Sequence, residues 1–242
     1  MKKLRTAIIG LAHVHVKMLS YDFAKYSDRV EIVGMADVPP YTKEELETRI
    51  SLNVPEDLEM KLYDDYKTLL NENIDIAVIC TDVKDHAAIV EETLAMGIYT
   101  VVEKPMALSM EDAKRMYRAY KKSTAELIIN WPVAWFPAYR KAKELAKSGA
   151  VGEILRVQYR SPSTRGPYGA DEYSAAELSK LWWYKHDRGG GSICDYAGYG
   201  CVLTTWITEK LQKEFQGSKR TSFCRFPMLK ITVYSPLISV TA

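Results

Sequence analysis

Short apolar runs alternate with helix-like segments through the first half of this chain, and this alternation constrains the fold more than any other feature of the sequence. The runs cover residues 4–9, 30–36, 74–80 and 98–102, and most of them are continuous rather than alternating in polarity. Strands that are buried on both faces have this pattern, and the helices between them cover a parallel sheet. We therefore expect an α/β fold with a doubly wound parallel sheet.

Helix boundary signals support this interpretation. Thr42 and Glu45 have the spacing of a reciprocal N-cap, Ser109 marks another helix start, and Gly97 stands where a helix should end. A further strand is expected at 126–130. The doubly wound domain is therefore predicted to span residues 1–125.

A second domain is predicted over residues 126–242, because the sequence changes character beyond Gly152. A strand is expected at 153–160, and a stretch rich in Gly, Pro, Ser and Tyr follows at 161–173. An aromatic cluster then occupies 182–184.

Composition excludes several classes of partner. The chain has 242 residues, 47% of them hydrophobic, and a formal net charge of +2 without a long basic run, so neither nucleic acid nor a membrane surface is indicated. Its apolar runs are shorter than the roughly 20 residues that a membrane span needs. The four cysteines lack CxxC spacing and are interpreted as free thiols. We expect a cytoplasmic protein that binds a small molecule.

Two motifs carry a resemblance to a known family. The first is Glu103-Lys104-Pro105, directly after the strand expected at 98–102. The second is a glycine run that begins at Gly189 and leads to Asp195 and, four residues later, Tyr199. Together they resemble the Gfo/Idh/MocA family, the relatives of glucose-fructose oxidoreductase and inositol dehydrogenase. The resemblance implies an N-terminal Rossmann domain and a C-terminal α+β domain with an open, mostly antiparallel sheet.

The turn after the first strand stands where a dinucleotide fingerprint would be. Gly10 keeps the first glycine of that pattern, but Ala12 and His15 replace the second and third, so position rather than motif supports a phosphate site at the helix start. Asp37 ends the second strand, where a carboxylate binds the ribose hydroxyls and repels a 2′-phosphate. NAD is therefore expected rather than NADP. The alternative is that Asp37 caps the turn into Pro39.

Further cofactor contacts are implied by the resemblance, which assigns them to His13, Thr81, His86 and Glu103. Thr81 and His86 match a family loop that follows the third apolar run, although His86 could instead cap its own helix. No metal site is expected, because His13 and His15 are two positions apart and should point in different directions on a helix.

The resemblance also implies the chemistry, a hydride transfer between a nicotinamide and a sugar, polyol or related cyclic hydroxyl or ketone. Tyr199 would be the general acid/base, as in the glucose-fructose oxidoreductase and dihydrodiol dehydrogenase branches. A phenol has a pKa of about 10, so it needs a nearby cation to work near neutral pH, and Lys104 would supply it. Asp195 would orient the pair, because residues four apart share one helix face.

Substrate contacts are expected from aromatic and cationic residues near the second motif. Trp183, His186 and Arg188 precede the glycine run, and Trp131 lies where the family has a different pattern, with Ala134 in place of a common arginine. These side chains suit a polyol surface, and the alternative is that they serve packing only.

The C-terminal region departs from the family. Residues 226–232 do not resemble the family's corresponding segment, and a frameshift near Pro227 would explain this; the alternative is an authentic hairpin in 229–241. A frameshift would leave the antiparallel sheet, through which a homo-oligomer would assemble, incomplete. The alternative function is therefore a catalytically silent NAD-binding regulator or an inactive fragment.

Overall fold

The structure is a computed structural model, and it describes residues 2–159, 174–191, 198–210, 216–220 and 228–232. These residues divide into two compact units. The first unit comprises Met1–Asn130 and Ala175–Gly190, and the second comprises Trp131–Ser174 and Gly191–Ala242. The segment that carries Trp183, His186 and Arg188 therefore belongs with the first unit, although the chain has by then passed through the second.

The first unit is built on a six-stranded sheet in the order β3-β2-β1-β4-β5-β6, in which all neighbouring strands are parallel. This order is that of a Rossmann fold, with a switch point between β1 and β4. The expected doubly wound sheet is confirmed. Its strands are β1 (Leu4–Ile9), β2 (Val30–Ala36), β3 (Leu62–Tyr63), β4 (Ile76–Ile79), β5 (Tyr99–Glu103) and β6 (Leu127–Asn130).

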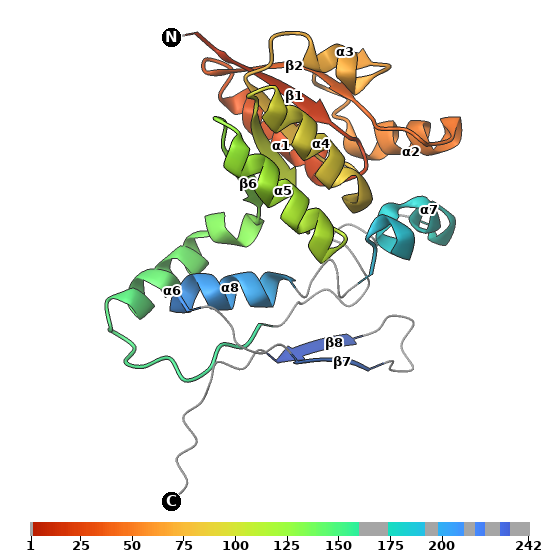
Figure 1. Ribbon diagram of the computed structural model, residues 1–242. Coiled ribbons are helices and arrows are strands. Elements are labelled where there is room, and N and C mark those ends of the chain that lie inside the picture. The colour runs from red at the N-terminus through yellow and green to blue at the C-terminus, as the bar shows by residue number, and fades with distance from the viewer. Residues whose placement is uncertain (1, 160–173, 192–197, 211–215, 221–227, 233–242) are drawn as a thin grey trace, which may run out of the picture. The chain divides into compact units, whose positions relative to one another are not determined.

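Helices cover both faces of this sheet (Figure 1). Consecutive residues of β1 point to opposite faces: Ile9 joins the core beneath one set of helices, and Ile8 joins the core beneath the other. The first set is α3 (Tyr66–Leu70), α4 (His86–Ala95) and α5 (Met110–Lys122). The second set is α1 (His15–Lys25) and α2 (Lys43–Asn53).

Local signals position these helices. The Oγ1 atom of Thr42 accepts the amide of Glu45 at 3.1 Å, and the amide of Thr42 donates to the Glu45 carboxylate at 3.0 Å, so the predicted capping box opens α2. Ser109 caps α5 through the amide of Asp112, as expected. Strand β3 and helix α3 were not anticipated, because a two-residue strand produces no apolar run.

The returning segment of the first unit contains α7 (Ala175–Lys180) and two short 3₁₀ helices, η4 (Trp182–Tyr184) and η5 (His186–Arg188). Its aromatic residues pack in a small core of their own. Trp182 and Trp183 contact Ala12 of the first turn and Val83 of η1 (Val83–Asp85). This packing brings residues from opposite ends of the sequence together.

The second unit contains η2 (Pro132–Trp135), α6 (Pro137–Lys147) and α8 (Gly198–Thr208), and α6 packs against α8. No strand is assigned at 154–159, where one was expected. Two antiparallel strands, β7 (Gln216–Arg220) and β8 (Met228–Thr232), form a separate ladder. The expected larger antiparallel sheet remains a prediction, and most of the proposed 229–241 hairpin lies outside the described residues. Within the described part of the chain, no helix has the length and apolarity to cross a membrane.

Candidate active site

The turn after β1 is shaped by Gly10, which has a φ of +91°. A Cβ atom at this position would lie 2.4 to 2.6 Å from atoms of Thr81, so only glycine allows the turn to lie against the loop after β4. Two residues predicted as cofactor contacts, Gly10 and Thr81, are therefore neighbours at the carboxyl end of the sheet. This edge is where ligands bind in open parallel sheets.

The backbone amides of this turn are mostly engaged within the protein. The Leu11 amide donates to Oδ1 of Asp37 at 2.9 Å, and the amides of Ala12 and His13 both lie 3.2 Å from the carbonyl oxygen of Cys80. Among the described residues, the amide of Val14 has no partner. It stands at the start of α1, where the helix dipole favours an anion. A pyrophosphate would therefore find one free amide here.

Asp37 is buried at the end of β2 and is held by Arg49 from α2. Nη1 of Arg49 lies 2.8 Å from Oδ2 of Asp37, and Nη2 lies 3.2 Å from Oδ1 of Asp82. Burial raises the pKa of Asp82, and the charge of Arg49 opposes that effect. A carboxylate offers about four acceptor positions, so Asp37 retains capacity for ribose hydroxyls beside its two protein donors. Sequence reasoning missed Arg49, because a helical arginine gives no sign of burial.

Ion pairs connect the returning segment to α2 and to the loop after β4. Lys185 lies 2.7 Å from Glu45 of α2, and Arg188 lies 3.4 Å from Glu45 and 3.3 Å from Asp82. The hydrogen bond from Lys185, with a second from the Thr42 amide, lowers the pKa of Glu45 to about 2. Arg188, predicted to contact substrate, thus bridges two carboxylates of its own unit, whereas His186 is exposed.

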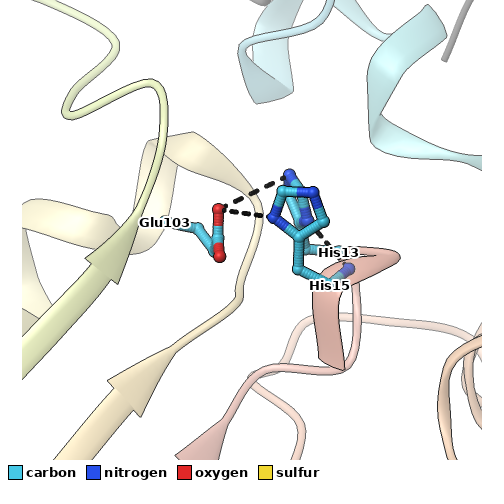
Figure 2. Close-up of side chains that lie close together, drawn as sticks. All are labelled: His13, His15 and Glu103. Atoms are coloured by element: carbon cyan, nitrogen blue, oxygen red, sulfur yellow. Dashed lines mark hydrogen bonds and ion pairs between the residues drawn. The ribbon is translucent and has the colours of Figure 1, made fainter. Parts of the chain in front are cut away.

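Glu103 ends β5, and its buried carboxylate faces the rings of His13 and His15 (Figure 2). Nδ1 of His15 lies 3.0 Å from Oε2 of Glu103, and Nε2 of His13 lies 4.0 Å from the same oxygen. Nδ2 of Asn130 donates to Oε1 at 2.7 Å, and the amide of Lys104 approaches Oε2 at 3.3 Å. The carboxylate is therefore fixed by contacts on both oxygens.

The expectation that the two histidines point apart was wrong. Their ring centroids lie 4.3 Å apart and both rings face Glu103. The angular spacing of a helix does not apply to the pair, because His13 lies in the turn and α1 begins at His15.

This cluster brings three groups of metal-ligand type together, with one ligand atom from each lying within 4.8 Å of the others. The position of the ring proton of His13 disfavours a metal ion at this cluster, however. Nδ1 of His13 accepts the amide of His15 at 3.1 Å, which places the proton of the neutral ring on Nε2. A metal needs a lone pair on that atom, and a ligating histidine normally donates its other ring N–H. The absence of a metal site remains a prediction, now supported by this tautomer.

Lys104 follows Glu103 and is 5% exposed. Its ammonium lies near His13: burial lowers the pKa of His13 well below its ordinary value, and the charges of His15, Lys104 and His86 lower it further. His86, the first residue of α4, is buried and approaches the carbonyl oxygen of Met106 at 3.2 Å through Nδ1. Burial lowers its pKa as well. Lys104 is therefore a buried residue close to an imidazole whose pKa is lowered.

Tyr199 belongs to the second unit, near the start of α8, and is 9% exposed. Its ring stacks on Tyr159 at a centroid distance of 5.9 Å and meets Trp131 edge-on at 5.2 Å. Two predicted residues, Tyr199 and Trp131, are thus brought together within one unit. Asp195 lies outside the described residues.

Comparison with known proteins identifies the family. The family model described as "Oxidoreductase family, NAD-binding Rossmann fold" matches residues 4–131, more than half of the chain. The chain belongs to the Gfo/Idh/MocA family of oxidoreductases. The resemblance carried by the Glu103-Lys104-Pro105 motif is confirmed.

Individual relatives of this family member are distant. Levoglucosan dehydrogenase of Pseudarthrobacter phenanthrenivorans is 29% identical over 164 residues, covering 60% of this chain and 40% of that protein. Myo-inositol 2-dehydrogenase of Thermotoga maritima is 23% identical over 163 residues, covering 66% of this chain and 46% of that protein. The chain thus spans less than half the length of these two relatives.

Solved structures show the same fold. The WlbA dehydrogenase from Bordetella pertussis, in complex with NADH and UDP-GlcNAcA, superposes with a TM-score of 0.66 at 22% identity, covering 94% of this chain and 64% of that one. Myo-inositol 2-dehydrogenase from Lactobacillus plantarum gives a TM-score of 0.64 at 24% identity, with 91% and 60% covered.

Proposed function

We propose that this chain is a nicotinamide-dependent oxidoreductase that interconverts a secondary hydroxyl and a ketone on a sugar, polyol or related ring. The observation that carries the proposal is the buried Lys104, which follows β5 at the carboxyl edge of the sheet in a chain of this family. The named relatives that act on levoglucosan and myo-inositol support a polyol-like substrate.

The cofactor would lie along the turn after β1. The free amide of Val14 would meet a phosphate, and Asp37 would accept the ribose hydroxyls. NAD is favoured over NADP because Asp37 is a carboxylate, although the adjacent Arg49 reduces its repulsion of a 2′-phosphate. A bound nicotinamide supplies or accepts the hydride, and the protein orients it and manages the proton.

Lys104 would hydrogen-bond the reacting oxygen and stabilise its developing negative charge, which is the electrostatic share of catalysis. Tyr199 would exchange the hydroxyl proton, and Asp195 would orient it. Trp131 and Trp183 would offer aromatic faces to the C–H surface of the ring, and His186 and Arg188 would contact its hydroxyls.

Two measurements test the proposal in sequence. Titration with NADH and NADPH, followed by nicotinamide fluorescence, should show saturable binding with a preference for NADH. A panel of polyols, inositols and anhydrosugars should then produce reduced cofactor, measured by its absorbance. Tight NADH binding without turnover on any of these substrates would favour a catalytically silent NAD-binding protein, and the absence of binding would contradict both functions.

A further inference from the structure

His15 is held so that one ring nitrogen donates and the other remains available. Its Nδ1 lies 3.0 Å from the carboxylate of Glu103, which can only accept, so Nδ1 carries a proton. In the neutral ring the lone pair is then on Nε2. That atom has no partner among the residues that the structure covers, and the side chain is 18% exposed.

Glu103 is rigid enough to orient this ring. The carboxylate is 1% exposed, and Asn130 and the amide of Lys104 donate to its two oxygens. A carboxylate that fixes the tautomer of an imidazole and stabilises its protonated form is the arrangement that makes histidine an efficient proton acceptor.

The other two imidazoles of this cluster have lowered pKa values. His13 is 2% exposed, and burial, with the nearby charge of Lys104, lowers its pKa well below the ordinary value. His86 on α4 is also buried, with a lowered pKa. The other titratable groups here are Lys104 after β5 and the Cys80 thiol after β4, and burial raises the pKa of that thiol well above its ordinary value.

We propose that His15 and Glu103 form a proton outlet for the reaction at Lys104, an inference that rests on the proposed oxidoreductase function. In the oxidation, a bound oxidised nicotinamide would accept the electron pair of the substrate C–H bond as hydride. The O–H bond would break as its electron pair forms the C=O bond, and the released proton would reach Nε2 of His15. The imidazolium faces Glu103 and releases the proton to water, and reduction runs the same path in reverse.

This role makes His15 a positioning and relay residue, so its test needs readouts that a structural role would not move. His15→Ala should lower kcat about 100-fold, as expected for loss of a proton-transfer group, with little change in NADH affinity. Added imidazole should restore part of the activity. The wild-type pH–rate profile should show an acid limb that His15→Gln lacks. An unchanged profile in His15→Gln, or no rescue of His15→Ala by imidazole, would overturn the proposal.

A measurement without turnover separates failure of this inference from failure of the proposed function. Nitrogen-15 NMR of labelled histidines in the wild-type protein should show, for neutral His15, a protonated Nδ1 and an unprotonated Nε2. Glu103→Gln should weaken that tautomer preference. The opposite tautomer in the wild type would overturn the dyad even if the enzyme is active, and the expected tautomer would support it even if no substrate is found.

The competing interpretation of this cluster is a metal site formed by His13, His15 and Glu103. Calorimetric titration with Zn²⁺ and Ni²⁺ should show no tight binding that depends on these side chains. Sub-micromolar binding that is lost in both His15→Ala and Glu103→Gln would mean that the cluster is a metal site, and the proton-outlet proposal would then be wrong.

Discussion

Arg49 donates to Asp37 at 2.8 Å in the interior of the first unit, and it reaches Asp82 with its other terminal nitrogen. One guanidinium therefore compensates two buried carboxylates, one at the end of β2 and one after β4. These positions lie on either side of β1 at the carboxyl edge of the sheet, so the arginine ties together the loops that follow β2 and β4.

Loss of this guanidinium should be strongly destabilising. Arg49→Gln leaves Asp37 buried without a cation and leaves Asp82 with Arg188 as its remaining partner. Breaking a buried ion pair in this way typically costs about 3 to 5 kcal/mol. The free energy of unfolding should fall by that order in urea denaturation. Arg29→Gln is the control, because Arg29 pairs with Asp28 on the surface at 70% exposure. A similar small change in both variants would contradict the role given to Arg49.

The ion pairs of Glu45 with Lys185 and Arg188 should limit local unfolding of the returning segment. Glu45→Gln removes the charge that holds Lys185 and Arg188, so amide hydrogen exchange over residues 181–190 should become faster while the sheet is unaffected. Glu47→Gln on the same helix is the matched control, since Glu47 is 65% exposed and, within the described part of the chain, pairs with Lys43 alone. Equal exchange in both variants would show that Trp182 and Trp183, rather than the charges, hold the segment.

Stability should fall on mild acidification because of His13 and His86. Burial lowers the pKa of both rings, so the folded protein keeps them neutral. The unfolded chain takes up these protons below about pH 6.5, so it binds more protons than the folded state. The free energy of unfolding therefore decreases as the pH is lowered. Each ring contributes at most about 1.4 kcal/mol per pH unit, until the pH reaches the lowered pKa. Urea denaturation at about pH 7.5 and 5.5 would measure this. His86→Gln should reduce the dependence on pH, and an identical slope in that variant would contradict the assignment.

Two glycines allow backbone strain to be separated from steric clash. Gly97→Ala should cost about 1 kcal/mol, because φ is +72° but no atom lies closer than 4.0 Å to the new Cβ. Gly10→Ala adds a clash with Thr81 to similar strain and should cost several times more. Thermal melts of the two variants make the comparison. Equal shifts would mean that the turn can move away from the loop after β4.

The sheet could be predicted from the sequence because each long strand is a continuous apolar run, which can be recognised without knowing the neighbouring strands. The helix starts at Thr42 and Ser109 could also be recognised from residues close in sequence. What the sequence could not reveal depends on contacts distant in the chain. Lys185 and Arg188 meet Glu45 more than 130 residues away, and isolated charges in a sequence indicate only a solvated surface.

In the candidate site, too, local signals could be recognised from the sequence and contacts between distant residues could not. Gly10, Thr81, His86 and Lys104 were placed at the carboxyl edge of the sheet because each follows a recognisable strand. The pairing of His15 with Glu103 was not foreseen, since a helical spacing was applied to a histidine that precedes its helix. Tyr199 and Trp131 meet in the second unit, and their role in the chemistry of Lys104 remains a proposal.

The central claim, that Lys104 and Tyr199 act on one reacting oxygen beside a nicotinamide, is tested most directly by turnover and cofactor affinity in two variants. Lys104→Met and Tyr199→Phe should each lower kcat by about 100-fold or more while the dissociation constant for NADH changes little. Tyr117→Phe, a change at an exposed tyrosine on α5, should leave both unchanged. Turnover in either active-site variant that equals that of the wild type would contradict the assignment.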